Sequence, residues 1–457
     1  MSKSILVDEI RYKSNSIERL FVPFFLISLT IPLSQTIFMP WLRIYFFDLF
    51  LFPILLLWYM RITASGIWKI NLRAVDVLLL CLLLWFFVCD LIAPRHDITF
   101  ERWLLWLRGV FIYFYFSRNF FRCISINMFI KVLAFIVVCE SIICIIQMIT
   151  QSNFGSINQY FGKSNQIVSS FVYNKEMISR DLYNKYRYVR VHGTFFHTGI
   201  IAEWMVLISP MLLSWYLKST TNKKNIFYLI VWLMGIISAI FTFSRTEWSS
   251  IGIGVILVLL WWRKLKVHKF IFYGKLDKKL ISIGCIALCA ILFIIIIFWY
   301  ANILDIYLFR ALDFNDRFLK KFSQINASWQ IMLWYPIFGV GQGNFGLYLH
   351  DTTFDYFYRG HGVVHNILFL IGAESGFIGV VLFIWLLIIA VWKNLKYIRI
   401  SPVTEFDIIK GAAVIAIICM TWNMQWSDGI KHHSLLPIYF VFLGIAVLNY
   451  IQWSTNG

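Results

Sequence analysis

The stretch from Tyr335 to Gly379 reads YPIFGVGQGNFGLYLHDTTFDYFYRGHGVVHNILFLIGAESGFIG. In it, a glycine-rich loop leads to the pair His365-Asn366, and this pair opens a long apolar run. Glycines let the backbone pack closely or take positive φ, and the start of a helix offers unpaired N–H groups to an anion. A histidine at that position tends to stay neutral, because the helix dipole disfavours a second proton. The stretch therefore predicts a helix start that holds a phosphate-bearing substrate and carries an imidazole able to act as a base.

Apolar runs recur along the whole chain and decide the fold class. Hydrophobic residues make up 60% of the sequence and charged residues 14%, against about 25% charged in ordinary soluble domains. Runs of about 18 residues or more can cross a bilayer as helices, which satisfy their own backbone hydrogen bonds. We predict an all-α fold, a polytopic transmembrane helical bundle that forms a single integral membrane domain over residues 1–457. About twelve spans are expected, at 20–39, 42–60, 74–93, 103–117, 128–149, 195–216, 226–243, 247–262, 280–300, 365–391, 408–426 and 434–451. The fourth is short, and we expect it to be tilted or broken.

The positive charge of the chain lies mainly in short loops. The net charge is +18, but there is no basic domain and no soluble module of basic and aromatic residues, which argues against nucleic acid as a partner. With the N-terminus inside, more than half of the 41 Lys and Arg residues fall in segments on the inner side. Short loops rich in Lys and Arg stay in the cytoplasm, so both termini are predicted to be cytoplasmic.

Two long polar loops then face outward, at 150–191 and 301–364. Both are longer than most helix–helix connections, which is typical of functional or disordered segments. The second, between predicted spans nine and ten, alternates aromatic and charged residues, so we expect it to be partly helical, with short amphipathic helices on the membrane face. The eight cysteines lie almost all in apolar runs and none in these loops, which predicts no disulfide framework and no metal site.

Three arginines on the predicted outer side are candidates for anion binding. Arg190, in the segment RVHGTFFH, can present a planar fork to a diphosphate, with an arginine that snorkels to the interface as the alternative. His192, in the same segment, is a weaker candidate. Arg245 lies in a very short turn between predicted spans seven and eight. The alternative is an anchor at the membrane boundary, but a tight turn fixes the direction of the side chain, and an ionisable group near membrane depth is a functional hypothesis by default. Arg317 is chosen among the four basic residues of the second loop, some of which we expect to be solvated surface.

The segment around His365 supplies further candidates. His365 is interpreted as the base or as a substrate contact, with a structural histidine as the alternative. His361, Arg359 and Asn366 are possible contacts beside it. Glu374 lies about two and a half turns into predicted span ten, where a carboxylate in lipid needs a partner, for which an arginine is suited.

This set of residues fits one kind of chemistry. Most glycosidases need a carboxylic acid to protonate the leaving oxygen, whereas a sugar on a lipid diphosphate does not, because diphosphate already leaves well as an anion. Arginines in a low-dielectric pocket stabilise that anion, and one base on the acceptor hydroxyl then suffices. We therefore predict metal-independent glycosyl transfer from a lipid-diphosphate donor on the outer face, with no cofactor.

A transporter or flippase is the alternative from another functional class. It needs ionisable residues deep in several spans and access from both sides of the membrane. This chain has few charges in the middle of its predicted spans, chiefly Glu140, Glu203 and Glu374, and its long loops lie on one side. These features favour the enzyme.

Three segments resemble the O-antigen ligase/polymerase superfamily of bacterial inner-membrane glycosyltransferases. RVHGTFFHTGIIAEWMVLISP, at 190–210, is similar to the family's Arg-x-x-Gly approach to a transmembrane helix, and FTFSRTEW, at 241–248, to its Ser-Arg turn. WYPIFGVGQGNFG and HNILFLIGAESGFIG, within 334–379, are similar to its most specific block. The family often places an arginine just ahead of the Trp-containing helix before that block. This chain departs from the pattern with QINASW at 324–329, and Arg317 lies further upstream.

The resemblance implies an inverting, GT-C-like transferase in the bacterial inner (cytoplasmic) membrane, with its active site facing the periplasm and an undecaprenyl-diphosphate-linked oligosaccharide as donor. It implies that Arg245 binds the diphosphate and that His365 activates the acceptor hydroxyl. Family members either polymerise lipid-linked repeat units or ligate finished glycan to lipid A-core; a polymerase would also have a chain-length-determining co-polymerase as a partner. Two long outer loops suggest room for two glycan chains, so an O-antigen or surface-polysaccharide polymerase is favoured, and a ligase is the alternative.

Overall fold

The chain folds into a bundle of helices. The computed structural model describes residues 17–31, 34–36, 43–65, 72–150, 191–195, 198–218, 224–242, 244–270, 314–351, 364–399, 404–427 and 432–448. Within these ranges the structure is almost entirely helical, which confirms the all-α fold class. They also contain a short antiparallel ribbon in which β1 (Ser34–Thr36) pairs with β2 (Arg43–Tyr45).

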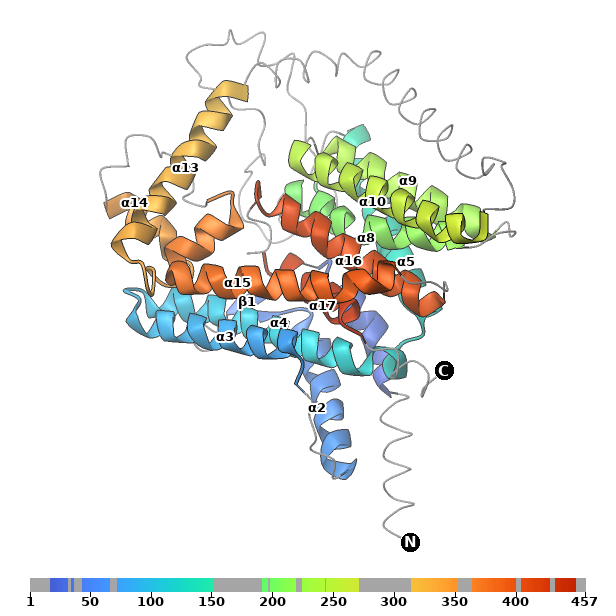
Figure 1. Cartoon of the computed structure of the whole chain (residues 1–457), viewed down its shortest axis with the longest axis horizontal. Coiled ribbons are helices and arrows are strands. Elements are labelled where there is room, and N and C mark those ends of the chain that lie inside the picture. Colours follow the sequence, from blue (N-terminus) through green and yellow to red (C-terminus); the bar gives the residue numbers. More distant parts are fainter. Residues whose placement is uncertain are drawn as a thin grey trace.

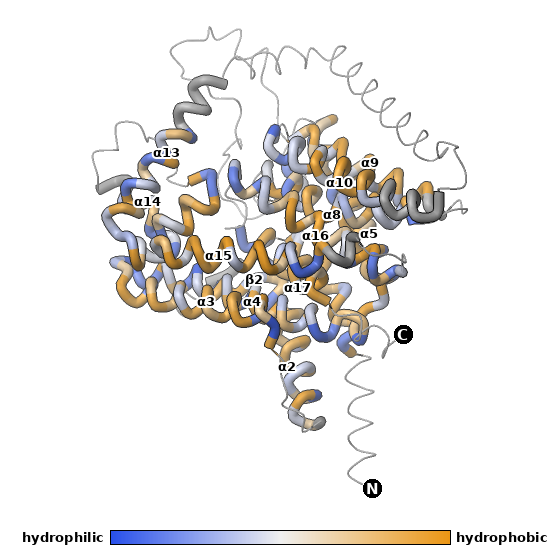
Figure 2. Tube along the Cα trace, viewed as in Figure 1, coloured by the Kyte–Doolittle hydropathy of each residue, from blue (hydrophilic) through white to orange (hydrophobic). Residues whose placement is uncertain are grey.

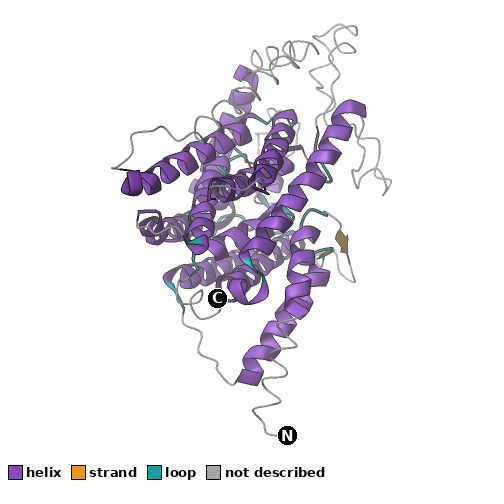
Figure 3. Ribbon diagram, turned by 90° about the vertical axis from the view of Figure 1, so that its right-hand side faces the viewer, coloured by secondary structure: helices purple, strands orange, loops and turns teal. Residues whose placement is uncertain are grey.

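The described helices differ widely in length and direction. After a helical segment at 17–28 they are α2 (Asp48–Ser65), α3 (Ala74–Ile92), α4 (His96–Cys123), α5 (Ile126–Thr150), α8 (Thr198–Lys218), α9 (Lys224–Phe241), α10 (Arg245–Phe270), α13 (Phe314–Trp334), α14 (Phe345–Asp351), α15 (Ile367–Arg399), α16 (Glu405–Asn423) and α17 (Leu435–Ala446). Figure 1 shows α15 running along the middle, between α3 and α4 on one side and α8, α9 and α10 on the other. Figure 3 shows the same bundle from the side, with the two strands at its edge.

Several of these helices have the length and composition of membrane spans. Among the described residues, α3, α5, α8 from Gly199 and α15 over Ile367–Leu395 are long and apolar enough to cross a bilayer, and α9 and α17 are apolar but shorter. Figure 2 shows apolar residues along these helices. One exposed stripe on α15 consists of Ile378, Val381, Trp385, Ile388 and Trp392. Spacings of three and four residues put them on one face, as expected of a lipid-facing surface. The chain is a multi-pass membrane protein; the count of twelve stays a prediction, and the ninth predicted span, 280–300, lies outside the described residues.

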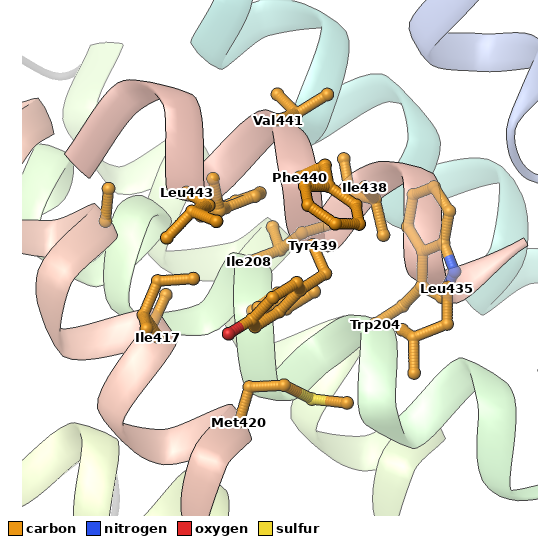
Figure 4. Close-up of a cluster of buried hydrophobic side chains, with 14 of the residues drawn as sticks. Trp204, Ile208, Ile417, Met420, Leu435, Ile438, Tyr439, Phe440, Val441 and Leu443 are labelled. Atoms are coloured by element: carbon orange, nitrogen blue, oxygen red, sulfur yellow. The ribbon is translucent and has the colours of Figure 1, made fainter. Parts of the chain in front are cut away.

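The helix α8 forms the centre of the bundle. Of the most apolar 18-residue stretch of α8, 94% is buried inside the bundle. Figure 4 shows Trp204 and Ile208 of α8 packed beside Tyr439 of α17 and Met420 of α16. Lipid tails are as apolar as these side chains, so close packing rather than exclusion of water stabilises such contacts.

Small residues bring some helices into close contact. A Cβ atom added at Gly109 of α4 would lie 2.3 Å from the ring of Phe440 on α17. The same addition at Gly411 of α16 would lie 2.4 Å from the ring of Trp261 on α10. Glycine is therefore required at both positions for the helices to pack at this distance.

Ion pairs tie helices together at one end of the bundle. They are Arg61–Glu18 and Arg118–Asp76, each at 2.8 Å between nitrogen and oxygen, and Lys218–Glu405. These residues belong to the ends of α2, α4 and α8 and to the starts of the 17–28 segment, α3 and α16. The start of α8 and the end of α16 therefore lie at the opposite end of the bundle, which is where the candidate site is found.

Three predicted spans differ from the structure. The first, 20–39, is wrong in extent, because the helix ends at 28 and the chain forms β1 at 34–36. The second, 42–60, begins too early, because Arg43–Tyr45 form β2 and α2 begins at Asp48. The fourth, 103–117, is not a short or broken helix but part of the continuous 28-residue α4. Its charged residue Arg108 bonds to Asp48 at 3.1 Å and to the carbonyl of Arg43 at 2.7 Å. Polar groups paired inside the bundle lower the hydropathy of the segment without ending the helix.

Candidate functional site

The glycine-rich loop packs against a break in α15. At Gly376 the backbone of α15 leaves the helical region, with φ 69° and ψ −175°. The loop donates the N–H of Val340 to the carbonyl of Ala373 and the N–H of Gly341 to the carbonyl of Glu374, each at 2.9 Å. The loop therefore supplies hydrogen bonds to carbonyls beside the break.

Glycine is needed on both sides of this contact. A Cβ added at Gly376 would lie 2.0 Å from the carbonyl oxygen of Ile337, and one added at Gly339 would lie 2.4 Å from the backbone of Glu374. Both glycines also have positive φ, which other residues rarely adopt. The sequence indicated close approach or positive φ at these glycines, and the structure has both.

Three N–H groups of the glycine-rich loop are hydrogen-bonded within the protein. The N–H groups of Val340 and Gly341 are occupied by α15, and that of Gln342 donates to Asp90 at 3.1 Å. These three N–H groups therefore bind protein acceptors.

The start of α15 is likewise capped by protein groups. The Oδ1 atom of Asn366 accepts the N–H groups of Leu368 and Phe369, at 3.0 and 3.2 Å. The N–H of Ile367 donates to the carbonyl of Met424 at 2.8 Å. Asn366 is thus an N-cap residue, and the expectation of an anion on these N–H groups is wrong. Any anion at this site is left to side chains.

His365 lies where α13, α15 and α16 meet. Its N–H points to the side-chain oxygen of Gln324 on α13 at 3.4 Å, and its side chain is half-buried. The next residue, Asn366, donates from Nδ2 to the carbonyl of Gln425 at 3.1 Å. Gln425 belongs to the turn at residues 424–427, which we call the terminal turn of α16. A third contact to this turn comes from Lys321 of α13, whose ammonium donates to the carbonyl of Trp426 at 2.9 Å.

Arg245 lies on the other side of the same helix end. It is the first residue of α10, and its side chain is exposed. One helical turn later, Ser249 accepts the indole N–H of Trp422 at 3.4 Å, and Ser250 donates to the side-chain oxygen of Asn423 at 3.3 Å. Trp422 and Asn423 are the last two residues of α16. The two motifs that carry Arg245 and His365 are therefore both attached to the carboxyl end of α16, at one end of the bundle.

Glu203 of α8 contacts the carboxyl end of α16 from inside the bundle. Its side chain is buried, and one of its carboxylate oxygens accepts bonds from Asn423, at 3.5 Å, and from Ser427. A carboxylate in a membrane helix needs such partners. This residue links α8, which follows the Arg190 segment, to the terminal turn of α16.

His192 and its neighbours form a structural contact with α5. The side-chain oxygen of Gln147 accepts the N–H groups of His192 and Gly193, at 2.9 and 3.1 Å. Glu140 accepts the N–H of Thr194 at 2.9 Å. His192 is fully buried, and this burial lowers the pKa of its imidazole. The backbone of Gly193 lies close to α5. His192 is therefore part of the packing between α5 and α8.

Other candidates fall outside what the structure describes. Arg190, Arg359 and His361 lie outside the described residues. The backbone of Arg317 belongs to the first turn of α13, four residues before Lys321, so both positions lie on one face of that helix.

Three polar residues near Glu374 were missed by the sequence analysis. Glu374 is buried and lines a cavity together with Arg102 of α4 and Gln342 of the glycine loop; Asp90, at the end of α3, bonds to that loop. Arg102 borders a predicted span, where an interfacial anchor is the ordinary interpretation. Asp90 was within three residues of the end of a predicted span, a boundary signal that could have marked it.

The comparisons with known proteins concern the same part of the chain. A family model described as O-antigen ligase matches residues 229–384, which run from α9 into α15 and include Arg245, Arg317 and His365. No curated protein matches the chain. The match confirms the resemblance drawn from the sequence motifs, and it supports an enzyme of the polymerase or ligase type in general. Over residues 229–384 the chain is therefore similar to the O-antigen ligase family, in line with the resemblance to the O-antigen ligase/polymerase superfamily.

Proposed function

We propose that this protein transfers a glycan from an undecaprenyl-diphosphate donor to a sugar hydroxyl, with Arg245 and His365 as the reacting groups. The observation that carries the proposal is the attachment of both motifs to the carboxyl end of α16, through Ser250–Asn423 on one side and Asn366–Gln425 on the other. A cation and an imidazole at one end of a membrane bundle are the two groups that this reaction needs.

The reaction proceeds by direct displacement. The acceptor hydroxyl oxygen attacks the anomeric carbon from the face opposite the diphosphate, so the configuration inverts. As the new C–O bond forms, His365 takes the hydroxyl proton, and the bond to undecaprenyl diphosphate breaks with its electron pair. The guanidinium of Arg245 neutralises the charge that develops on the leaving diphosphate. Arg190 and Arg317 are proposed as further contacts of the same diphosphate.

Backbone groups take no part in this scheme. The N–H groups at 340–342 and 367–369 are hydrogen-bonded to protein acceptors. Neutralisation of the diphosphate therefore rests on arginine side chains, whose planar fork matches phosphate oxygens in two bonds.

Polymerisation of repeat units is our first proposal for the biological reaction, because two long outer segments suggest room for two glycan chains. Ligation of finished glycan to lipid A-core is the second, favoured by the description of the matching family. In both cases we place the reaction on the periplasmic face of the bacterial inner membrane, with both termini in the cytoplasm.

Purified full-length protein with lipid-linked repeat units tests the proposal. A ladder of longer glycans supports a polymerase, whereas transfer only to added lipid A-core supports a ligase. Arg245→Ala and His365→Ala should each remove the product. Arg19→Ala is the matched control, because Arg19 is exposed and bonds to the carbonyl of Arg122, which lies beside the ion-paired end of the bundle. Persistence of wild-type polymer in cells that carry the double variant at Arg245 and His365 would contradict an enzyme and favour a transporter.

A further inference from the structure

The ammonium group of Lys321 lies at the carboxyl end of α16. It donates to the carbonyl of Trp426 at 2.9 Å, and the side chain is half-buried. Three residues later on α13, the side-chain oxygen of Gln324 accepts the N–H of His365 at 3.4 Å. Residues three apart lie on one face of a helix. Lys321 therefore lies on the face of α13 that contacts both the end of α16 and the segment of the proposed base.

The terminal turn of α16 presents successive carbonyls that accept hydrogen bonds from neighbouring elements. Those of Met424 and Gln425 accept neutral donors from the start of α15, at 2.8 and 3.1 Å. That of Trp426 accepts the ammonium of Lys321. The carbonyls at a helix end need donors rather than a net charge, as the first two show. The ammonium thus brings a positive charge that capping alone does not require.

An anchor at the membrane surface is the ordinary alternative for a lysine on an amphipathic helix. Such a side chain extends away from the protein, toward water and lipid headgroups. Lys321 instead turns toward the terminal turn of α16, where it is half-buried. Its charge is therefore held next to the segments that carry Arg245 and His365, because both segments are attached to this end of α16.

The place of this charge matters for a diphosphate. The carboxyl end of a helix carries a partial negative charge of about −0.5, which repels an anion. A diphosphate that binds Arg245 while its sugar reacts beside His365 lies near the carboxyl end of α16. An ammonium at that end opposes the repulsion, and it can donate to phosphate oxygens in charge-assisted hydrogen bonds.

We propose that Lys321 binds the diphosphate of the donor together with Arg245. The proposal rests on the proposed function and adds a residue to its donor site. Lys321 stays protonated throughout and forms no covalent bond. The electron pair of the broken C–O bond stays on the leaving phosphate oxygen, and the two cations neutralise the charge that develops on the diphosphate.

Three substitutions separate the charge of Lys321 from its hydrogen bond. Lys321→Arg keeps both, Lys321→Gln keeps a donor for the carbonyl and loses the charge, and Lys321→Met loses both. We expect kcat/KM for the lipid-linked donor to stay within about threefold of wild type in Lys321→Arg, and to fall about tenfold or more in the other two. Lys393→Gln is the matched control, because Lys393 is an exposed lysine near the far end of α15.

A residue that only caps α16 would give a different order of activities. Lys321→Gln would then transfer glycan as wild type does, and this result would overturn the proposal, whether or not Lys321→Met is impaired. A loss in Lys321→Arg as large as that in Lys321→Gln would overturn it as well, because the charge would then not be what the reaction uses.

Binding of inorganic pyrophosphate tests the contact without turnover. Calorimetry is done on the full-length protein in detergent free of phospholipid, so that lipid headgroups do not compete. Lys321→Gln should raise the Kd about tenfold, and Lys393→Gln should leave it unchanged. An equal Kd in Lys321→Gln and wild type, at unchanged Tm, would show that the ammonium does not contact the anion. Absence of binding to the wild-type protein would count against the whole donor site.

Failure of this inference and failure of the proposed function give different results. If the wild-type protein transfers no glycan from the lipid-linked donor, the proposed function fails, and the role of Lys321 fails with it. If the wild-type protein transfers glycan, Arg245→Ala removes the product and Lys321→Gln does not reduce it, only the inference on Lys321 is wrong.

Discussion

The backbone N–H of Ile367 donates to the carbonyl of Met424 at 2.8 Å. The first turn of α15 is therefore held against the terminal turn of α16, and His365, two residues before Ile367, takes its position from that contact. On the opposite side of the same helix end, Ser250 bonds to Asn423 and fixes the turn that begins with Arg245. The distance between the proposed cation and the proposed base thus depends on one short segment that neither motif contains.

The N-cap of α15 should be needed for activity as well as for stability. Asn366→Ala removes the acceptor for Leu368 and Phe369 and the donor to Gln425. We expect a loss of about 1–2 kcal/mol in the free energy of unfolding and a larger fractional loss of transfer, because His365 loses its support. Asn366→Asp keeps the cap and loses only the donor, so its Tm should stay near that of wild type. Equal Tm and activity in Asn366→Ala and wild type would contradict this role.

Substitution at the break in α15 should be severe. Gly376→Ala places a methyl group 2.0 Å from the carbonyl of Ile337 at a positive φ. We expect a loss of at least about 3 kcal/mol, since the strained backbone alone costs about 1–3 kcal/mol. Gly252→Ala is the control, because a Cβ there meets nothing within 4 Å, and helix propensity favours alanine by up to about 1 kcal/mol. Thermal unfolding in detergent measures both variants, and similar Tm values for the two would refute the assignment.

Glu203 should act by holding the end of α16. Glu203→Gln keeps a side-chain oxygen for Asn423 and Ser427, so transfer should stay within about threefold of wild type. Glu203→Ala leaves both partners without their acceptor in a buried site, and we expect kcat to fall about tenfold or more with little change in donor KM. Steady-state kinetics on both variants make the comparison. A loss in Glu203→Gln as large as in Glu203→Ala would show that the charge itself is needed.

Acid should destabilise the protein through His192. Burial lowers the pKa of this imidazole from its ordinary value of 6.5. Below about pH 6.5 the unfolded chain binds a proton at His192 that the folded chain does not bind. The free energy of unfolding is therefore unaffected by this group above about pH 6.5 and decreases as the pH falls below it. The slope is at most about 1.4 kcal/mol per pH unit. His192→Gln should flatten the dependence of Tm on pH between about pH 7 and about pH 5, and an unchanged slope would count against a buried neutral His192.

Long apolar runs were a reliable guide to the helices. The runs that predict spans 74–93 and 128–149 correspond to α3 and α5 within a few residues, because a membrane helix contains its own hydrogen bonds and its composition is set by lipid. The same reasoning predicted a helix shorter than α4, because Arg108 is paired with Asp48 inside the bundle. Composition alone does not reveal such a pair, since its partner lies 60 residues away.

The candidate site was harder to predict than the spans. The sequence indicated that glycines 339 and 376 allow unusual backbone or close contact, which is correct. It could not indicate that the loop would bind Asp90, which is 252 residues from Gln342. The end of α16 carries no motif, yet its last residues and terminal turn contact the segments of Arg245, His365 and Glu203. Contacts between distant segments decide the site, and they follow from packing that one sequence does not display.

The break at Gly376 divides α15 into two pieces with different surroundings. The piece before it carries the wall of the cavity and is hydrogen-bonded to the glycine loop and to α16, whereas the piece after it presents the exposed apolar stripe. A helix that does not match the thickness of its bilayer responds by tilting or bending. The piece after Gly376 can tilt while the piece before it keeps its position. We therefore expect transfer rates to change little between vesicles of short-chain and long-chain lipids.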